Sequence, residues 1–275
     1  MGIITLTSDM GLADAYVASV KAAVLHHAPQ AQIVDISHAV RSFDLLHAAY
    51  LINEVWREFP IGTVHVIGVK PEFTMQQAHI VVHHMGHYFI AADNGVIPLI
   101  IDESPEDIYE IHITQADQWK FPMKGVFALA AAHLSKGGTP EVLGKRVETL
   151  QYAFVPGADF SGNEIRGRVM HIDHYGNVIT NVHRHEFTQA CKGRAFSINF
   201  KSSAFDLTKI HEYYTEVVQG ERLAMWTSNG DLMIAINSGT TQHGGGAAQL
   251  FGLQLRDSII ITFDDYENSE NDNSY

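Results

Sequence analysis

The chain opens with the stretch IITLTSDMG at residues 3–11, a β-branched run that ends at a Ser-Asp-x-Gly turn. An amphipathic helical pattern follows at residues 14–27. In an open α/β sheet, the turn after the first strand faces the crevice in which ligands bind. Asp9 is therefore predicted to bind a pair of ligand hydroxyls, and Gly11 allows the backbone to approach closely. The alternative is that Ser8 or Asp9 only caps the helix.

Length and composition indicate an ordinary enzyme-sized protein. The 275 residues, 46% hydrophobic and 10% aromatic, suffice for one large domain or two modest ones. No apolar run reaches the ~18–20 residues that span a bilayer, and no signal peptide is visible, so we expect no membrane partner. The single Cys191 excludes an intrachain disulfide and indicates a reducing, cytoplasmic location. The net charge of −13 argues against a nucleic-acid partner, which would require a basic surface.

The pattern of strands and helices predicts two domains. Residues 1–155 alternate strand and helix patterns, which indicates an α/β domain whose mostly parallel sheet is covered by helices. Residues 156–166 are the expected linker, and residues 167–264 show the short alternating strands of a smaller all-β domain. Residues 265–275 form an acidic, flexible tail.

The individual elements are expected as follows. In the first domain we expect strands at 3–7, 32–36, 63–69, 79–83 and 88–91, and helices at 14–27, 44–58 and 127–136. In the second domain we expect strands at 167–172, 178–182, 195–200, 222–227, 232–236 and 258–263.

The 17 histidines raise the question of a metal site. The densest group, His83, His84 and His87, falls in strand patterns, where adjacent side chains point to opposite faces and do not share an ion. No His or Cys cluster has the spacing of a zinc site. A Gly-x-Ser-x-Gly nucleophile elbow is also missing from the sequence. We therefore expect no metal centre and no serine nucleophile.

Two polar turns admit both a local and a functional interpretation. Asp173 and Asn177 flank a glycine turn between two expected strands of the second domain. In the first domain, Asp93-Asn94-Gly95 follows a strand and is either a type I′ turn or a polar ligand contact. Asp and Asn side chains often bond their own backbone, so the local pattern leaves both interpretations open.

Taken in order, the motifs resemble the S-adenosylmethionine (SAM) hydroxide adenosyltransferase family, the relatives of fluorinase and chlorinase, over residues 3–263. The motifs are TSDMGLAD at 7–14, VDISH at 34–38, SFD at 42–44, FPIGTVHV at 59–66, DNG at 93–95, IDHYGN at 172–177, SNG at 228–230, IAIN at 234–237 and GAA at 246–248. So many motifs in the family's order make the resemblance specific.

The resemblance implies an SN2 displacement at the 5′ carbon of SAM, in which methionine leaves and hydroxide or a halide attacks. Such a reaction needs positioning and a partly desolvated nucleophile more than it needs a strong acid. The resemblance also implies SAM as substrate or ligand, no separate cofactor, and a homotrimer with sites at subunit interfaces.

Family positions imply roles for individual residues. Asp9 would bind the ribose hydroxyls, because two carboxylate oxygens match two donors. Aromatic packing on the nucleoside would come from Phe43 and Tyr214. The remaining substrate contacts are Asn177 and the Ser238 backbone at the adenine edge, Asp14, Asp173 and Ser228 at the methionine moiety, and Asn94.

The water-activating group departs from the family pattern. Hydrolases of the family carry Asp-Pro-Gly-Val-Gly followed by Arg, and a His before a Gly-Arg-Asp run. Here the segments read KPEFTMQQ at 70–77 and FPMKGVFA at 121–128. Lys70 replaces the Asp, Gln77 replaces the Arg, and Pro122 falls on the His position. Lys70, Thr74 and Gln77 are therefore expected to line a rebuilt nucleophile pocket.

Three functions remain open at this point. The first is cleavage of SAM to adenosine and methionine by altered water-activating residues. A non-catalytic adenosine- or SAM-binding protein and an adenosyltransferase with a different anionic nucleophile are the alternatives. Lys70 would attract such an anion by its charge, or it is only a solvated charge at a strand end.

Overall fold

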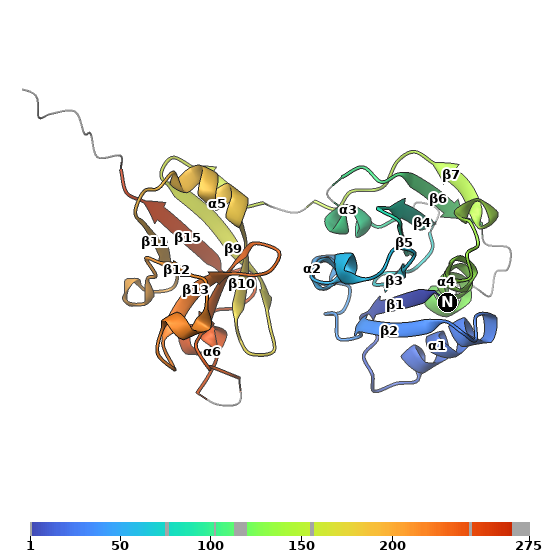
Figure 1. Ribbon diagram of the computed structural model, residues 1–275, viewed down its shortest axis with the longest axis horizontal. Coiled ribbons are helices and arrows are strands. Elements are labelled where there is room, and N and C mark those ends of the chain that lie inside the picture. The colour runs from blue at the N-terminus through green and yellow to red at the C-terminus, as the bar shows by residue number, and fades with distance from the viewer. Residues whose placement is uncertain are drawn as a thin grey trace, which may run out of the picture. The chain divides into compact units, whose positions relative to one another are not determined.

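A computed structural model describes residues 2–74, 77–101, 103–112, 120–154, 157–241 and 244–265. The chain divides into two compact units, Met1–Phe154 and Val155–Tyr275. Each unit is built around its own sheet (Figure 1). Within the described residues, no helix combines the length and the apolar character that a membrane span requires.

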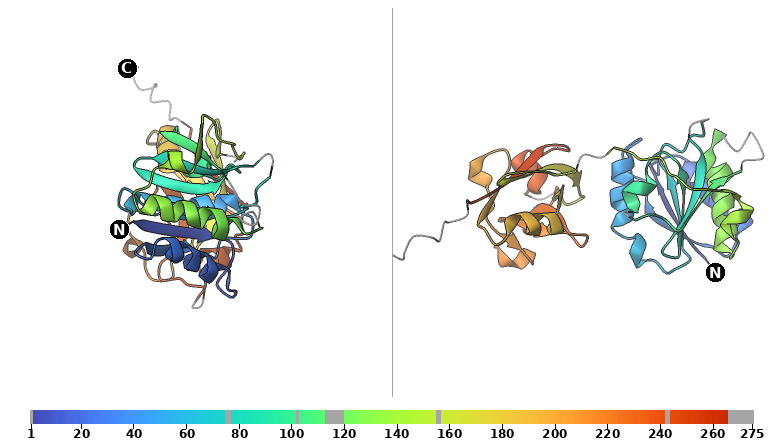
Figure 2. Two further views of the ribbon diagram at one scale, coloured as in Figure 1. Left: turned by 90° about the vertical axis from the view of Figure 1, so that its right-hand side faces the viewer. Right: turned by 90° about the horizontal axis from the view of Figure 1, so that it is seen from above.

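The N-terminal unit has a seven-stranded sheet in the order β2-β1-β3-β5-β4-β6-β7. The strands are β1 (Ile3–Ser8), β2 (Gln32–Ser37), β3 (Val64–Gly68), β4 (His79–His84), β5 (His87–Ala92), β6 (Asp107–Ile111) and β7 (Gly144–Val147). The helices are α1 (Tyr16–His27), α2 (Leu45–Asn53), α3 (Ile97–Ile100) and α4 (Ala128–Ser135). Helices α1 and α4 share one hydrophobic core with the sheet, and α2 and α3 share another on the opposite face (Figure 2).

The prediction of a mostly parallel sheet is wrong, because the sheet is mixed. Strand β1 pairs parallel with β2 and β3, and β3 pairs parallel with β5. Strand β4 is antiparallel to β5 and β6, and β6 is antiparallel to β7. Only Met85 and Gly86 separate β4 from β5. So short a connection allows only an antiparallel pair, since parallel neighbours need a crossover of about a dozen residues.

The C-terminal unit has an eight-stranded sheet in the order β11-β15-β9-β10-β14-β13-β12, with β8 paired to β9. The strands are β8 (Asp159–Ser161), β9 (Glu164–Ile172), β10 (Val178–His183), β11 (Phe196–Asn199), β12 (Ile210–His211), β13 (Arg222–Trp226), β14 (Asp231–Ile236) and β15 (Ser258–Phe263). Helices α5 (Arg184–Cys191) and α6 (Ala247–Phe251) contribute to its core. The unit is thus largely β rather than all-β.

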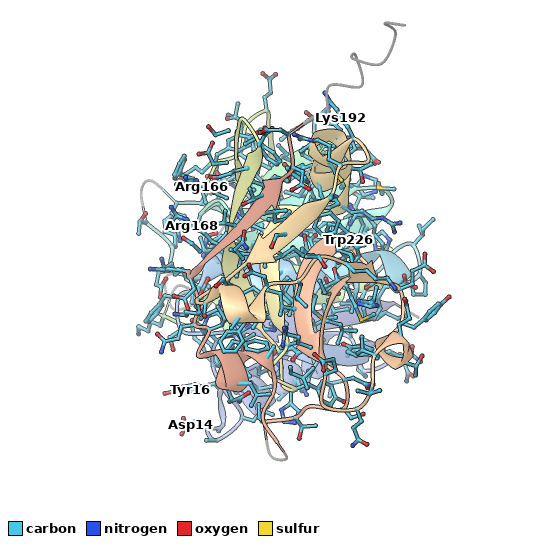
Figure 3. The ribbon with its side chains drawn as sticks, turned by 90° about the vertical axis from the view of Figure 1, so that its left-hand side faces the viewer. Asp14, Tyr16, Arg166, Arg168, Lys192 and Trp226 are labelled. Carbon is cyan, nitrogen blue, oxygen red and sulfur yellow. The ribbon has the colours of Figure 1, made fainter. Side chains whose placement is uncertain are left out.

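Strand β9 shows the alternation that its sequence predicts. Ile165 and Val169 are buried in the core, whereas Arg166 and Arg168 are exposed (labelled in Figure 3). Period-two alternation of this kind is typical of a strand with one buried face.

A row of buried polar side chains crosses the N-terminal sheet. Thr5 Oγ1 lies 2.8 Å from His65 Nδ1, and His65 Nε2 lies 3.2 Å from His87 Nδ1. Phe89 stacks on the His65 ring, and Trp56 contacts it edge-on. Burial lowers the pKa of His65 to about 3, and the neighbouring His87 contributes to the same shift.

We expect acid to destabilise the N-terminal unit through His65. Its folded-state pKa of about 3 lies below the ordinary 6.5, so the side chain takes up a proton on unfolding. The stabilisation is fully present above the unfolded-state pKa and is lost as pH falls toward 3, at up to ~1.4 kcal/mol per pH unit. Urea unfolding at a series of pH values below neutrality measures this slope.

The His65→Phe variant should show a smaller slope, because phenylalanine does not titrate. The matched control is His26→Phe, since His26 is exposed at the end of α1. Identical pH dependence in the wild type and in His65→Phe would contradict the assignment.

The turn between β9 and β10 packs against the start of α6 through glycine. Gly176 has a φ of +82°, and a Cβ there would lie 2.6 Å from Gln249 Oε1 and 3.0 Å from Gly246 Cα. Its carbonyl accepts a hydrogen bond from the Ala248 N–H at 2.9 Å. The close approach and the left-handed φ both require glycine at this position.

Gly176→Ala should therefore destabilise the protein more than an alanine at an open left-handed glycine. Gly162 is the matched control, because its φ is +58° and a Cβ there would meet no other atom within 4 Å. We expect Gly162→Ala to lower the free energy of unfolding by about 1–2 kcal/mol through its backbone conformation alone. Gly176→Ala should lower it clearly more, because its Cβ also clashes with neighbouring atoms. Urea unfolding of the full chain compares the two, and equal losses would show that the Gly246 contact is unimportant.

Candidate active site

The predicted residues of the N-terminal unit lie at one edge of its sheet. Asp9 follows β1 directly, His38 follows β2, Lys70 lies two residues beyond β3, and Asn94 lies two residues beyond β5. Strands β2, β1, β3 and β5 are neighbours in this order and run in the same direction. Their carboxyl ends therefore meet where open α/β sheets bind ligands.

Asp9 does not cap a helix. Helix α1 begins at Tyr16, and its N-cap residue Ala15 forms no side-chain capping bond. Instead, Asp9 Oδ2 accepts a hydrogen bond from the Phe43 N–H at 2.8 Å. The second oxygen, Oδ1, forms no hydrogen bond within the described part of the chain and can accept one from a ligand.

Phe43 is an exposed aromatic residue in a strained conformation. Its φ is +63°, and 60% of its surface is exposed. A left-handed conformation costs a non-glycine residue about 1–2 kcal/mol. The bond from Phe43 to Asp9 offsets part of this cost and fixes an open aromatic surface beside the carboxylate.

His38 joins the turns after β1 and β2, and it was not predicted as a site residue. Its Nδ1 lies 2.7 Å from Ser8 Oγ, and its carbonyl accepts a bond from the Gly11 N–H at 2.8 Å. On the other side, His38 Nε2 lies 3.2 Å from Asp35 Oδ1. Burial raises the pKa of Asp35, but hydrogen bonds from Lys21 and His38 outweigh it and hold this pKa below its ordinary value. The VDISH motif at residues 34–38 is the sequence signal that could have identified His38 as a site residue.

Asp14 lies just before α1 and is exposed (Figure 3). Its carboxylate forms no hydrogen bond or ion pair with the described residues, so it can bind a ligand ammonium group. The neighbouring Tyr16 contacts Phe121 edge-on, with ring centroids 5.9 Å apart. Asp14 is thereby two residues from a side chain that touches the 121–128 segment.

The predicted nucleophile-pocket residues share the loop after β3. Lys70 is exposed with a φ of +47°, and its ammonium group forms no ion pair in the described chain. The side-chain amide of Gln77 donates to the loop backbone, with Nε2 lying 3.1 Å from the Lys70 carbonyl oxygen and 2.7 Å from that of Glu72. Thr74 and Gln77 exchange two backbone hydrogen bonds of 3.2 Å. Lys70 is therefore the positively charged group of this loop that is available to a ligand, and Glu72 is the exposed negatively charged one.

The segment 121–128, in which the resemblance puts the family's histidine at Pro122, packs through apolar contacts, and Pro122 is buried. Met123 is fully buried, and its Sδ would lie 1.8 Å from a Cβ at Gly68, the last residue of β3. A π-helical turn, Met123–Phe127, carries this contact into α4. Such turns are frequent at functional sites. Residues 120–128 contain neither a histidine nor a carboxylate.

The Asp93-Asn94-Gly95 turn does not close a hairpin, so the type I′ interpretation is wrong. Asp93 Oδ1 accepts a hydrogen bond from the Gln151 N–H at 2.9 Å, and burial raises the pKa of this carboxyl. Asn94 Nδ2 donates to the carbonyls of Val69 and Lys70 at 3.0 and 3.1 Å. Both side chains thus bind neighbouring backbone, and Asn94 lies beside the Lys70 loop.

In the C-terminal unit, Asp173, Asn177 and Tyr214 form one cluster. Asp173 Oδ1 accepts bonds from the N–H groups of Tyr175 and Asn177, both at 2.9 Å, and Oδ2 accepts one from Asn177 Nδ2 at 2.8 Å. Asn177 Nδ2 also lies 3.4 Å from the Tyr214 hydroxyl. Burial raises the pKa of Tyr214, and the charge of Asp173 adds to the shift. The local backbone role of Asp173 is confirmed.

Ser238 lies at the same end of the sheet, whereas Ser228 does not. Val178 at the start of β10 pairs with Ile234 near the end of β14, and Ser238 follows that end with a φ of +60°. Ser228 precedes β14, at the end where β10 finishes. The structure therefore groups Ser238 with Asn177 and places Ser228 at the opposite end of β14.

No group of three or more His, Cys, Asp or Glu side chains in the described ranges could hold a metal ion. In each unit, the polar and aromatic residues at the strand ends described above are suited to bind an organic ligand through hydrogen bonds and aromatic contacts.

Comparison with known proteins places this geometry in a family. Residues 4–144 match the SAM hydroxide adenosyltransferase N-terminal domain, and residues 167–268 match the C-terminal domain of the same family. The chain is 31% identical to an (R)-S-adenosyl-L-methionine hydrolase from Thermus thermophilus over 262 residues, which cover 90% of this chain and 96% of the relative. It is 27% identical to a fluorinase from Nocardia brasiliensis, covering 86% of this chain and 90% of the relative.

A solved structure of a conserved protein from Thermotoga maritima is similar with a TM-score of 0.81 and 26% identity, covering 95% of this chain and 99% of that one. The two domain matches span most of the sequence in the family's order. The chain therefore belongs to the SAM hydroxide adenosyltransferase family.

Proposed function

We propose that this protein cleaves SAM by displacement at its 5′ carbon, releasing methionine and an adenosine product. The observation that carries the proposal is Asp9, which keeps one carboxylate oxygen open beside the exposed Phe43 ring. The names of the relatives support the same substrate, since they include SAM hydrolases and a fluorinase.

The family resemblance assigns the nucleoside to these residues, and their chemistry is compatible with that assignment. Asp9 Oδ1 would accept a ribose hydroxyl, and Phe43 and Tyr214 would pack on the nucleoside with their aromatic faces. Asn177 Nδ2 is engaged by Asp173, which leaves its carbonyl oxygen for the adenine edge. Asp14 is the proposed partner of the methionine ammonium group.

The reaction proposed is a single displacement. The nucleophile forms a bond to the 5′ carbon while the carbon–sulfur bond breaks, and the electron pair of that bond neutralises the sulfonium. Because no charge builds up on the leaving group, positioning and desolvation matter more than acid catalysis. With Lys70, Gln77 and Pro122 in place of the usual group, we expect water to be activated poorly.

Incubation with SAM, with and without chloride, and chromatography of the nucleosides test this function. We expect adenosine or a 5′-substituted adenosine, formed ~10²–10⁴-fold more slowly than by relatives with the intact group. Lys70→Asp alone should not restore the rate, because Gln77 and Pro122 would remain in place of the family's Arg and His. Tight nucleoside binding with unchanged SAM would instead favour a non-catalytic binding protein, the candidate that the altered group supports.

We further propose a homotrimer in which residues of both units contribute to each ligand site at a subunit interface. Asp9→Ala should weaken adenosine binding by ~1.5–3 kcal/mol, the contribution of a hydrogen bond to a charged group. Asn177→Ala should also weaken it. Mixing the two variants should restore some strong binding sites, because a site can then combine an intact Asp9 from one subunit with an intact Asn177 from its neighbour. Calorimetry measures the restored affinity, and light scattering measures the size of the assembly.

A monomer that binds adenosine at full affinity would rule out this assembly. Unchanged affinity in Asp9→Ala would rule out its ribose role. The cytoplasmic location stays a prediction from the single cysteine.

A further inference from the structure

We propose that His79, Gln77 and Asn94 are positioning residues that hold Lys70 as the binding residue for a small, singly charged anion. The inference rests on the proposed function, which supplies two sources for such a charge. One is the carboxylate of the methionine moiety, and the other is a free anion that attacks the 5′ carbon.

Two side-chain amides bind the backbone of the loop on either side of Lys70. Asn94 Nδ2 donates to the carbonyls of Val69 and Lys70 at 3.0 and 3.1 Å. Gln77 Nε2 donates to the carbonyls of Lys70 and Glu72 at 3.1 and 2.7 Å. The Lys70 carbonyl therefore accepts from both amides, which limits rotation of the peptide groups around it.

His79 binds the Pro71 carbonyl, which lies in the chain between the carbonyls of Lys70 and Glu72. Its Nε2 lies 2.8 Å from the Pro71 carbonyl oxygen, which can only accept, so Nε2 carries the proton. The side chain is fully buried, with Phe73 and Phe127 edge-on at 5.6 and 4.9 Å. Its Nδ1 is buried and has no hydrogen-bond partner among the residues that the structure describes. Burial lowers the pKa of His79, so the ring stays neutral when it holds the loop.

This arrangement explains how a lysine occupies a left-handed position. Lys70 has a φ of +47°, a conformation that favours glycine. Strained residues of this kind persist where the surroundings determine the backbone, and they cluster at ligand-binding sites. Three neutral side chains supply that constraint here, and they fix where the lysine side chain leaves the backbone.

The constraint adds no charge of its own. Asn94, Gln77 and His79 are neutral, and Lys70 forms no ion pair in the described chain. Glu72 is exposed and likewise forms none there. The ammonium group of Lys70 is therefore free of an ion pair at the ligand edge of the sheet, where it would attract an anion, with Glu72 as the nearest opposing charge in the loop.

If the anion attacks, the reaction balances without a further reactant. The anion donates an electron pair to form the bond to the 5′ carbon, and the carbon–sulfur bond breaks with its pair left on sulfur. The products are a 5′-substituted 5′-deoxyadenosine and methionine. If the anion is the substrate carboxylate, Lys70 orients the methionine moiety and takes no part in the bond changes.

Chloride is the probe for the anion site, and broadening of its NMR line measures binding without any nucleoside. We compare the wild type with Lys70→Gln, His79→Phe and Gln77→Leu. The control is His84→Phe, which removes a buried histidine from the opposite end of β4. Calorimetry with SAM and with adenosine, which lacks the carboxylate, identifies the source of the charge.

For a free anion, we expect chloride broadening in the wild type and in His84→Phe, and at least a tenfold weaker effect in the other three variants. For a substrate carboxylate, those three variants should bind SAM at least tenfold more weakly and adenosine normally. Either result supports the positioning role, and comparison with His84→Phe separates it from loss of stability.

The proposal is overturned if His79→Phe and Gln77→Leu match His84→Phe in chloride binding and in the ratio of SAM to adenosine affinity. Failure of the proposed function is a separate outcome, in which the wild type binds neither SAM nor adenosine. Chloride broadening that depends on Lys70 and His79 would still stand in that case.

Discussion

The N-terminal unit depends on one constraint, the need to satisfy backbone groups where four parallel strands end together. Beyond a strand end, the ladder no longer pairs the peptide groups, and unpaired buried groups are costly. Here side chains from neighbouring turns replace the ladder. Asn94 donates to two carbonyls beyond β3, including that of the buried Val69, and Asp9 accepts from the N–H of the exposed Phe43. The residues that complete the backbone are thus the same residues that define the ligand edge.

The sequence predicted this edge because the local signals agree. Apolar and β-branched runs identified β1, β2, β3 and β5, and Asp9 and Asp93-Asn94-Gly95 indicated the turns after β1 and β5. The mixed character of the sheet was missed because β6 and β7 are weak signals. β7 has four residues, and its two central residues, Lys145 and Arg146, are exposed. The link of Met85 and Gly86 could have shown that β4 and β5 are antiparallel.

Partnerships across the chain were not predictable from local patterns. The role of His79 depends on a carbonyl eight residues away, and that of Asn94 on carbonyls 24 and 25 residues away. Ser228, in contrast, was predicted to lie at the site, but the structure places it at the end of β14 away from Asn177. The turns on both sides of β14 contain polar residues, and no local feature tells which turn shares an end with Asn177. Only the register of β10 against β14 separates them.

Lys70 and Gln77, which the family resemblance compares with an Asp and an Arg, lie together in the loop after β3. Gln77 Nε2 lies within 3.1 Å of the Lys70 carbonyl, so the two positions are adjacent in space. An Asp and an Arg at these positions would compensate each other, whereas a Lys beside an Arg would repel it at short range. Gln77 donates the hydrogen bonds that hold the loop and carries no charge. The pair therefore carries a single positive charge and keeps the backbone support on which the edge depends.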